Sequence, residues 1–205
     1  RAVELGLKGI GLADRNSVAG VVRAHAALRD VIESLGEPID FKLAVGARLA
    51  FADGTPDIVA YPANRRGWAN LCRLLTLGNR RATKGQCILH VEDLIDHADA
   101  LLLIVIPSRH SQPPSRHSRE SGNPASSSSL SSPSPSPSAG ERQLDPRFRG
   151  DDEVVGRLVE AAPGRVWLAA TMAHKGRDRR RLAALRVHGV PLIATSDVLY
   201  HVPEQ

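Results

Sequence analysis

Two aspartates stand after strand-like runs, one near each end of the chain. Asp14 follows the apolar run GIGLA at residues 9–13, and Asp197 follows the run VPLIATS at residues 190–196. In sheets with parallel strands, functional sites collect at the carboxyl ends of the strands. We therefore expect the fold to bring Asp14 and Asp197 to one edge of a sheet, where any site would lie.

Arginines form the second group of residues that could do chemistry. Residues 177–188 predict a basic helix, and residues 64–77 predict a second helix with arginines around it. Such clusters contact DNA phosphates or a neighbouring domain, and a solvated helix face gives the same pattern. The residues that we single out for such a contact are Arg177, Arg179, Arg180, Arg181, Arg65 and Arg66.

Other kinds of chemistry have no pattern in the sequence. The eight histidines do not follow the spacing of metal ligands, and there is no glycine-rich phosphate loop, Ser-His-Asp pattern or Cys-x-x-Cys pair. Cys72 falls on the apolar face of a predicted helix, which indicates a buried thiol rather than a redox group.

The composition bounds the class of protein. The chain has 205 residues, of which 42% are hydrophobic but only 3% aromatic, so its core must consist of Leu, Val, Ile and Ala. Its net charge of +5 suits a nucleic-acid partner without proving one. No apolar run approaches the roughly 18 residues of a membrane span, and no signal peptide is evident, so we expect no membrane partner and a cytoplasmic location.

Hydrophobic periodicity predicts alternating strands and helices. Asn16 or Ser17 is expected to cap the first helix, Asn64 to cap the second, and Gly78 to end that second helix. This alternation predicts an α/β fold with a largely parallel sheet, open or closed into a barrel, including a hairpin around the turn at 53–56. The expected strands are 8–13, 41–51, 57–61, 101–106, 165–170 and 190–195, and the expected helices are 17–35, 64–77, 91–97, 154–161 and 177–188.

The composition changes abruptly between residues 108 and 152. This segment is rich in Ser, Pro and Arg and has almost no large apolar residue. It cannot bury enough surface to offset its ordering entropy, so we predict a disordered low-complexity insertion. A docking tail is the functional alternative.

Five stretches carry a family resemblance. They are LGLKGIGLADRNSVAGVVRAH at 5–25, VGARL at 45–49 with DGTP at 53–56, LCRLLTLG at 71–78, KGQC at 84–87 and ATSDVLYHVP at 194–203. In this order they resemble the polymerase-and-histidinol-phosphatase (PHP) domain, in the form found in bacterial error-prone C-family DNA polymerases. The resemblance covers residues 1–107 and 153–205, which we interpret as two parts of one domain separated by the insertion.

The resemblance implies a distorted (β/α)7 barrel, incomplete here at its amino end, with a metal cleft at the carboxyl ends of the strands. In active members, His, Asp, Glu and Cys side chains there hold up to three metal ions, which clamp the attacking and leaving oxygens of a phosphoester. Three positions of that cleft have a counterpart here, namely Asp14, Asp197 and His201.

The chain departs from the family pattern at most of the metal ligands. The motif Thr-Asp-His reads ADR at residues 13–15, the motif Asp-x-His reads DVL at 197–199, and His201 comes two residues late. The Glu expected after Gly46 is absent, and a His-x-His motif would precede Arg1. Because an arginine repels cations, we expect a degenerate site in which Asp14 pairs with Arg15, with Arg48 or with a backbone amide.

The function implied is that of a fragment, shortened at both ends, of an error-prone DNA polymerase. The parent would synthesise DNA past damage with Mg²⁺ in a palm domain outside this chain. We expect the fragment to be a structural module without a cofactor, whose partners are the remaining polymerase domains and, through the parent, DNA. Two alternatives stay open: an active metallophosphoesterase, of the histidinol-phosphatase or proofreading type, that holds Zn²⁺ or Mn²⁺, and a pseudogene product.

Overall fold

The computed structural model describes residues 1–36, 38–107, 149–171, 176, 178–186 and 189–195. Its elements follow the alternation that the sequence predicts. In chain order they are β1 (Gly9–Arg15), α1 (Val21–Leu35), β2 (Lys42–Leu49), β3 (Ile58–Pro62), α2 (Arg65–Arg81), α3 (Val91–His97), β4 (Leu101–Val105), α4 (Arg149–Ala161), β5 (Val166–Ala170), α5 (Asp178–Leu185) and β6 (Leu192–Ala194).

The six strands form one mixed sheet whose order follows the chain from β1 to β6. β1 is parallel to β2, and β4, β5 and β6 are parallel to one another, whereas β3 is antiparallel to both of its neighbours. Five strands therefore point the same way, which confirms the predicted largely parallel sheet and the hairpin between β2 and β3. We call the edge where these five strands end the carboxyl rim; it is marked by Arg15, Leu49, Val105, Ala170 and Ala194.

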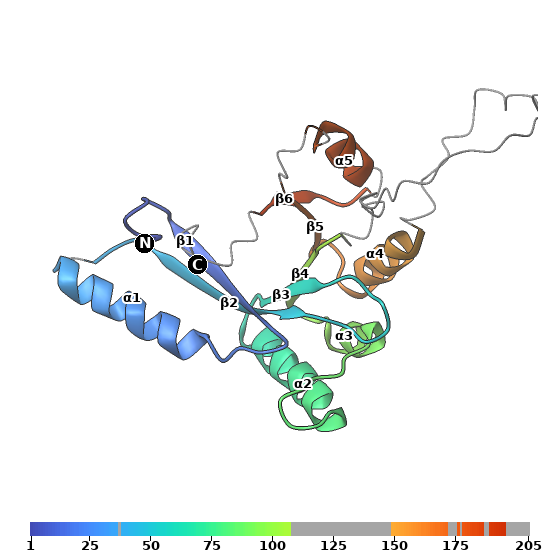
Figure 1. Ribbon diagram of the computed structural model, residues 1–205, viewed down its shortest axis with the longest axis horizontal. Helices are drawn as coiled ribbons and strands as arrows, with labels where there is room; N and C mark the ends of the chain where they lie inside the picture. The colour runs from blue at the N-terminus through green and yellow to red at the C-terminus, as the bar shows by residue number, and fades with distance from the viewer. Residues whose placement is uncertain (37, 108–148, 172–175, 177, 187–188, 196–205) are drawn as a thin grey trace, which may run out of the picture.

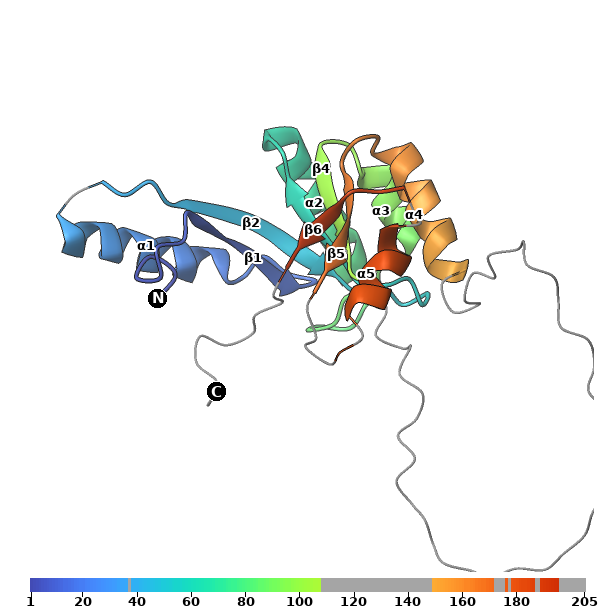
Figure 2. The same ribbon diagram turned by 90° about the horizontal axis from the view of Figure 1, so that it is seen from above.

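The core lies on one face of the sheet, under α2, α3 and α4 (Figures 1 and 2). Its buried hydrophobic side chains are Leu, Ile, Val and Ala, as the low aromatic content predicts. Fully buried members come from the middle strands and the three helices; they include Ile58, Leu71, Leu74, Leu94, Leu101, Leu103 and Leu158.

The unit formed by β1 and α1 extends away from this core. The sheet curls so that β1 and the start of β2 point away from β4, β5 and β6 (Figures 1 and 2). α1 has no buried residue, and Val22 remains 74% exposed. The apolar spacing of α1 therefore covers only one side of a two-stranded arm and contributes little to the main core.

The ends of two helices differ from the sequence predictions. α1 begins at Val21, because the Asn16 side chain bonds to Ala50 and the hydroxyl of Ser17 accepts the amide of Ala19, at 3.0 Å, rather than an amide of the helix. α2 begins as predicted, with the Asn64 side chain accepting two backbone amides, but it continues through Gly78 to Arg81. Gly78 does not end the helix because it serves another purpose: a β-carbon there would lie 2.5 Å from the sulfur of Cys87, so the missing side chain admits the following loop.

The predicted insertion lies mostly outside the described residues. Residues 108–148 are not described, and α4 starts at Arg149 rather than at Val154. Acidic residues near the start of a helix are favourable, which fits the position of Asp152 in this extra turn. At the other end of the chain, residues 2–6 form a turn that closes on Gly6, at φ 70°.

Two helical glycines give a matched test of this packing. A β-carbon on Gly67 of α2 would lie 2.1 Å from the carbonyl oxygen of Ala100, whereas one on Gly156 of α4 would meet nothing within 4 Å. We expect Gly67→Ala to lower the free energy of unfolding by about 3 kcal/mol through overpacking. Gly156→Ala should raise it by about 0.5–1 kcal/mol, since alanine is the better helix former.

Urea unfolding followed by circular dichroism measures both effects. Equal changes in the two variants would contradict the close approach of α2 to the start of β4.

Candidate site at the carboxyl rim

Asp14 bonds to the backbone that leads into α1. Its Oδ2 accepts the amide of Gly20 at 2.6 Å, and a β-carbon on Gly20 would lie 2.6 Å from the same oxygen. Glycine is thus required for this contact, and the carboxylate lies at the positive end of the helix dipole. A backbone amide is one of the three partners that the sequence suggests for Asp14, and the two arginines bond to a different acid.

Arg15 and Arg48 share the carboxylate of Asp57. The two arginines are directly opposite in the last register pair of β1 and β2. The Arg48 Nε donates to Asp57 Oδ2 at 2.8 Å, and the Arg15 guanidinium reaches the same oxygen at 3.4 Å. Since the Arg15 side chain is 69% exposed, its ion pair is the weaker of the two, and much of its guanidinium faces solvent.

The side chain of Asn16 extends the pairing of β1 with β2 by one further pair of hydrogen bonds, which we call the Asn16 rung. Its amide nitrogen donates to the carbonyl of Ala50 at 3.1 Å, and its side-chain oxygen accepts the amide of Ala50 at 2.8 Å. Its backbone is left-handed, at φ 46°, a conformation that Asn adopts more readily than most residues. Asn16 therefore fixes the turn after β1 against the end of β2.

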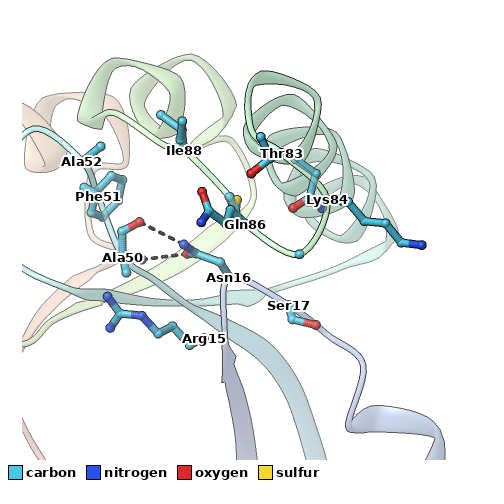
Figure 3. Close-up of a pocket in the computed structure, with 13 residues that line it drawn as sticks. Arg15, Asn16, Ser17, Ala50, Phe51, Ala52, Thr83, Lys84, Gln86 and Ile88 are labelled. Atoms are coloured by element: carbon cyan, nitrogen blue, oxygen red, sulfur yellow. Dashed lines mark hydrogen bonds between the residues drawn. The ribbon is translucent and has the colours of Figure 1, made fainter.

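A pocket of about 810 Å³ opens beside Asn16 (Figure 3). Its walls come from the end of β1, the segment after β2, and the segment from Asn79 to Ile88 that ends α2 and continues beyond it. Among the residues that the structure describes, the lining includes two cations, Arg15 and Lys84, and no acidic residue. Phe51 forms part of the wall and also packs against the core. The KGQC stretch that carries the family resemblance thus lies in this pocket.

Two aspartates hold the loops behind the pocket. Burial works to raise the pKa of Asp53, but bonds from Thr55 and from the amide of Val91 outweigh it, and the pKa falls below its usual value. The pKa of Asp93 is lowered in the same way: burial opposes ionisation, and bonds from Arg81 and from the His90 amide outweigh it. Both carboxylates therefore stay ionised as structural acceptors.

Cys87 lines the pocket as a neutral thiol. Burial raises the pKa of this thiol, which disfavours the thiolate that a nucleophile or a zinc ligand requires. Cys72 and Cys87 are both free, and each is half-buried. Cys72 lies on α2 but is half-buried rather than buried as the sequence predicts.

The other residues singled out from the sequence separate into three groups. Asp197, His201 and Arg177 lie outside the described residues. Arg179, Arg180 and Arg181 belong to α5, and Arg179 is exposed. At the start of α2, Arg65 is exposed, whereas the Arg66 Nε pairs with Asp99 at 2.7 Å.

The part of the chain that the structure describes contains no group of three or more His, Cys, Asp or Glu side chains able to hold a metal ion. Within the same residues, no helix is long and apolar enough to cross a membrane. Sequence reasoning missed the structural roles of Asp57 and Asn16. A polar residue after a strand was a usable signal for Asn16, but nothing local marks Asp57 as the partner of two arginines on other strands.

Asn16→Gly tests the rung that supports the pocket. Glycine keeps the left-handed backbone but removes both bonds to Ala50, so we expect the free energy of unfolding to fall by about 2 kcal/mol. Ser17→Ala, at the adjacent pocket-lining position, should change it by less than about 0.5 kcal/mol. Chemical denaturation measures both, and an unchanged midpoint for Asn16→Gly would show that the rung contributes nothing.

Comparison with known proteins gives one consistent relationship. No protein-family model matches the chain. It is 42% identical over 202 residues to an error-prone DNA polymerase of Sinorhizobium medicae, a match that covers 97% of this chain and 14% of that protein. It is 40% identical over 213 residues to the error-prone DNA polymerase of Brucella abortus, covering the whole of this chain and 16% of that one.

A third relative, named error-prone DNA polymerase 1, comes from Rhizobium meliloti and is 42% identical over 206 residues. It too extends far beyond the match, which covers 98% of this chain and 15% of that protein. The chain spans about one seventh of the length of these relatives. Over nearly its whole length, the chain is therefore similar to one segment of these much longer error-prone DNA polymerases.

Proposed function

We propose that this chain acts as a PHP-type structural module of an error-prone DNA polymerase and works without a metal ion of its own. The observation that carries the proposal is the chemistry of the carboxyl rim. At the position where a family ligand would follow Asp14, the chain has Arg15, which bonds to Asp57 rather than leaving room for a cation. Asp14 itself is engaged with the amide of Gly20.

The curled sheet supports a barrel of the PHP type. Five strands end at one rim, and β6 ends at Ala194, three residues before Asp197. A chain leaving β6 thus starts from the same rim as Asp14. In this proposal the two aspartates form the remnant of a cleft, and neighbouring polymerase domains complete the barrel and cover the exposed arm of β1 and α1.

In the longer parent, nucleotidyl transfer with Mg²⁺ would take place in other domains, and this module would help to hold them on DNA in the cytoplasm. A metallophosphoesterase is the alternative, and it requires ligands for Zn²⁺ or Mn²⁺. Its remaining candidates, Asp14, Asp197 and His201, include only one residue that the structure describes, and that one already has a backbone partner.

Metal analysis separates the two functions. We expect the purified chain, after incubation with Zn²⁺ or Mn²⁺ and gel filtration, to retain less than one equivalent of either ion. It should not hydrolyse p-nitrophenyl phosphate above the rate of a buffer blank, because two carboxylates beside an arginine hold divalent ions poorly. Two or more bound equivalents together with hydrolysis would establish the metallophosphoesterase instead.

The same preparation distinguishes a folded module from a pseudogene product. A folded module should unfold in one cooperative thermal transition, whereas a chain that never folds stably would show none.

A further inference from the structure

We propose that the exposed side of α2 and the pocket at its end form a binding path for single-stranded DNA. The inference rests on the proposed function, since it gives the module a contact with the nucleic acid on which its relatives are named to act. It comes from three features of the described residues: charge, unused polar groups and one aromatic ring.

The charge on α2 has one sign. Its sequence, RRGWANLCRLLTLGNRR, contains five arginines and no acidic residue. Arg66 and Arg81 are neutralised by Asp99 and Asp93. The other cations of this region have no carboxylate partner among the described residues; they are Arg65, Arg73, Arg80 and, just past the helix, Lys84.

Three of these cations lie between the middle of α2 and the pocket. Arg73 and Arg80 are seven residues apart in α2, so the helical repeat places them on one side of the helix. Lys84 lies three residues past the end of α2, in the loop that lines the pocket. All three are exposed, and the only described partner of the Arg73 guanidinium is the neutral side chain of Asn70, at 3.2 Å. We call Arg73, Arg80 and Lys84 the α2 stripe.

The pocket continues the stripe with polar groups that the protein leaves unused. Among the described residues, the side chains of Asn79, Thr83 and Gln86 line the pocket without a hydrogen bond to protein. Figure 3 shows Lys84 reaching outward at one side of Asn16 and Arg15 at the other side. A phosphate chain entering along the stripe would therefore meet cations at both rims of the pocket and neutral donors between them.

Phe51 favours a single strand over other anions. Phe51 is half-buried: it packs against the core and also lines the pocket. Proteins that bind single strands without sequence preference combine a cationic track with aromatic rings on which bases stack. A duplex keeps its bases paired and stacked, and an acidic peptide has no base to place on the ring.

Fluorescence anisotropy of a labelled twelve-residue oligothymidylate, titrated with the full 205-residue chain over a series of salt concentrations, tests the proposal. Each variant Arg73→Gln, Arg80→Gln and Lys84→Gln should reduce the slope of log affinity against log salt by about 0.7, the value for one phosphate contact on a single strand. The matched control is Lys42→Gln, an exposed cation at the opposite end of β2, which should leave the slope unchanged.

Phe51→Leu should lower the affinity roughly tenfold without changing the slope, because it removes stacking and no charge. Thermal melts establish that each variant is folded before its binding is compared.

The outcomes that would overturn the proposal are equally definite. If Lys42→Gln lost as much slope as the stripe variants, the salt dependence would reflect only the net charge of the chain, and the proposed path would be wrong. Preference for a duplex, equal affinity for polyglutamate, or equal affinity for inorganic phosphate would each exclude a single-strand path. If the chain binds no metal ion and unfolds cooperatively but does not bind DNA, this inference is wrong. The proposed function as a structural module would still stand.

Discussion

The last rung of the β1–β2 pair sets the constraint on which the carboxyl rim depends. Parallel pairing places Arg15 directly opposite Arg48, and neighbouring strands lie only about 4.8 Å apart. Two guanidinium groups that extend from neighbouring strands repel each other unless an anion lies between them. Asp57 supplies it, because β3 runs in the opposite direction and so begins at the rim where the other strands end.

That local arrangement determines what the rim can bind. The acid that could attract a cation is shared by two arginines, and Asp14 is directed to the start of α1. The pocket beside them has cations at its sides, and none of its described lining residues is acidic. Among the described residues, the lining of this pocket is therefore cationic, which suits an anion better than a cation.

Much of the fold follows from the sequence, because hydrophobic periodicity and turn residues are local. The alternation of strands and helices, the Asn64 cap and the direction of most strands are predicted in this way. Gly78 shows the limit: a glycine late in a helix indicates an end, yet here it admits the loop at Cys87. The ion pair of Arg66 with Asp99 and the pairing of Asp57 with two arginines cannot be predicted from the sequence either, because each joins residues that are separated in the chain. At the site, the sequence indicates Asp14 and the arginines of α2, whereas the pocket depends on how three segments meet.

Paramagnetic NMR tests the central claim, that the carboxyl rim is not a cation site, most directly. In a spectrum of the ¹⁵N-labelled chain, Mn²⁺ bound at the rim would broaden the amide signals nearest to it. The account predicts that the amides of Asp14, Arg15, Asn16 and Gly20 keep the same relative intensity as those of exposed residues elsewhere when Mn²⁺ is added. Selective loss of these signals, centred on Asp14, would contradict it.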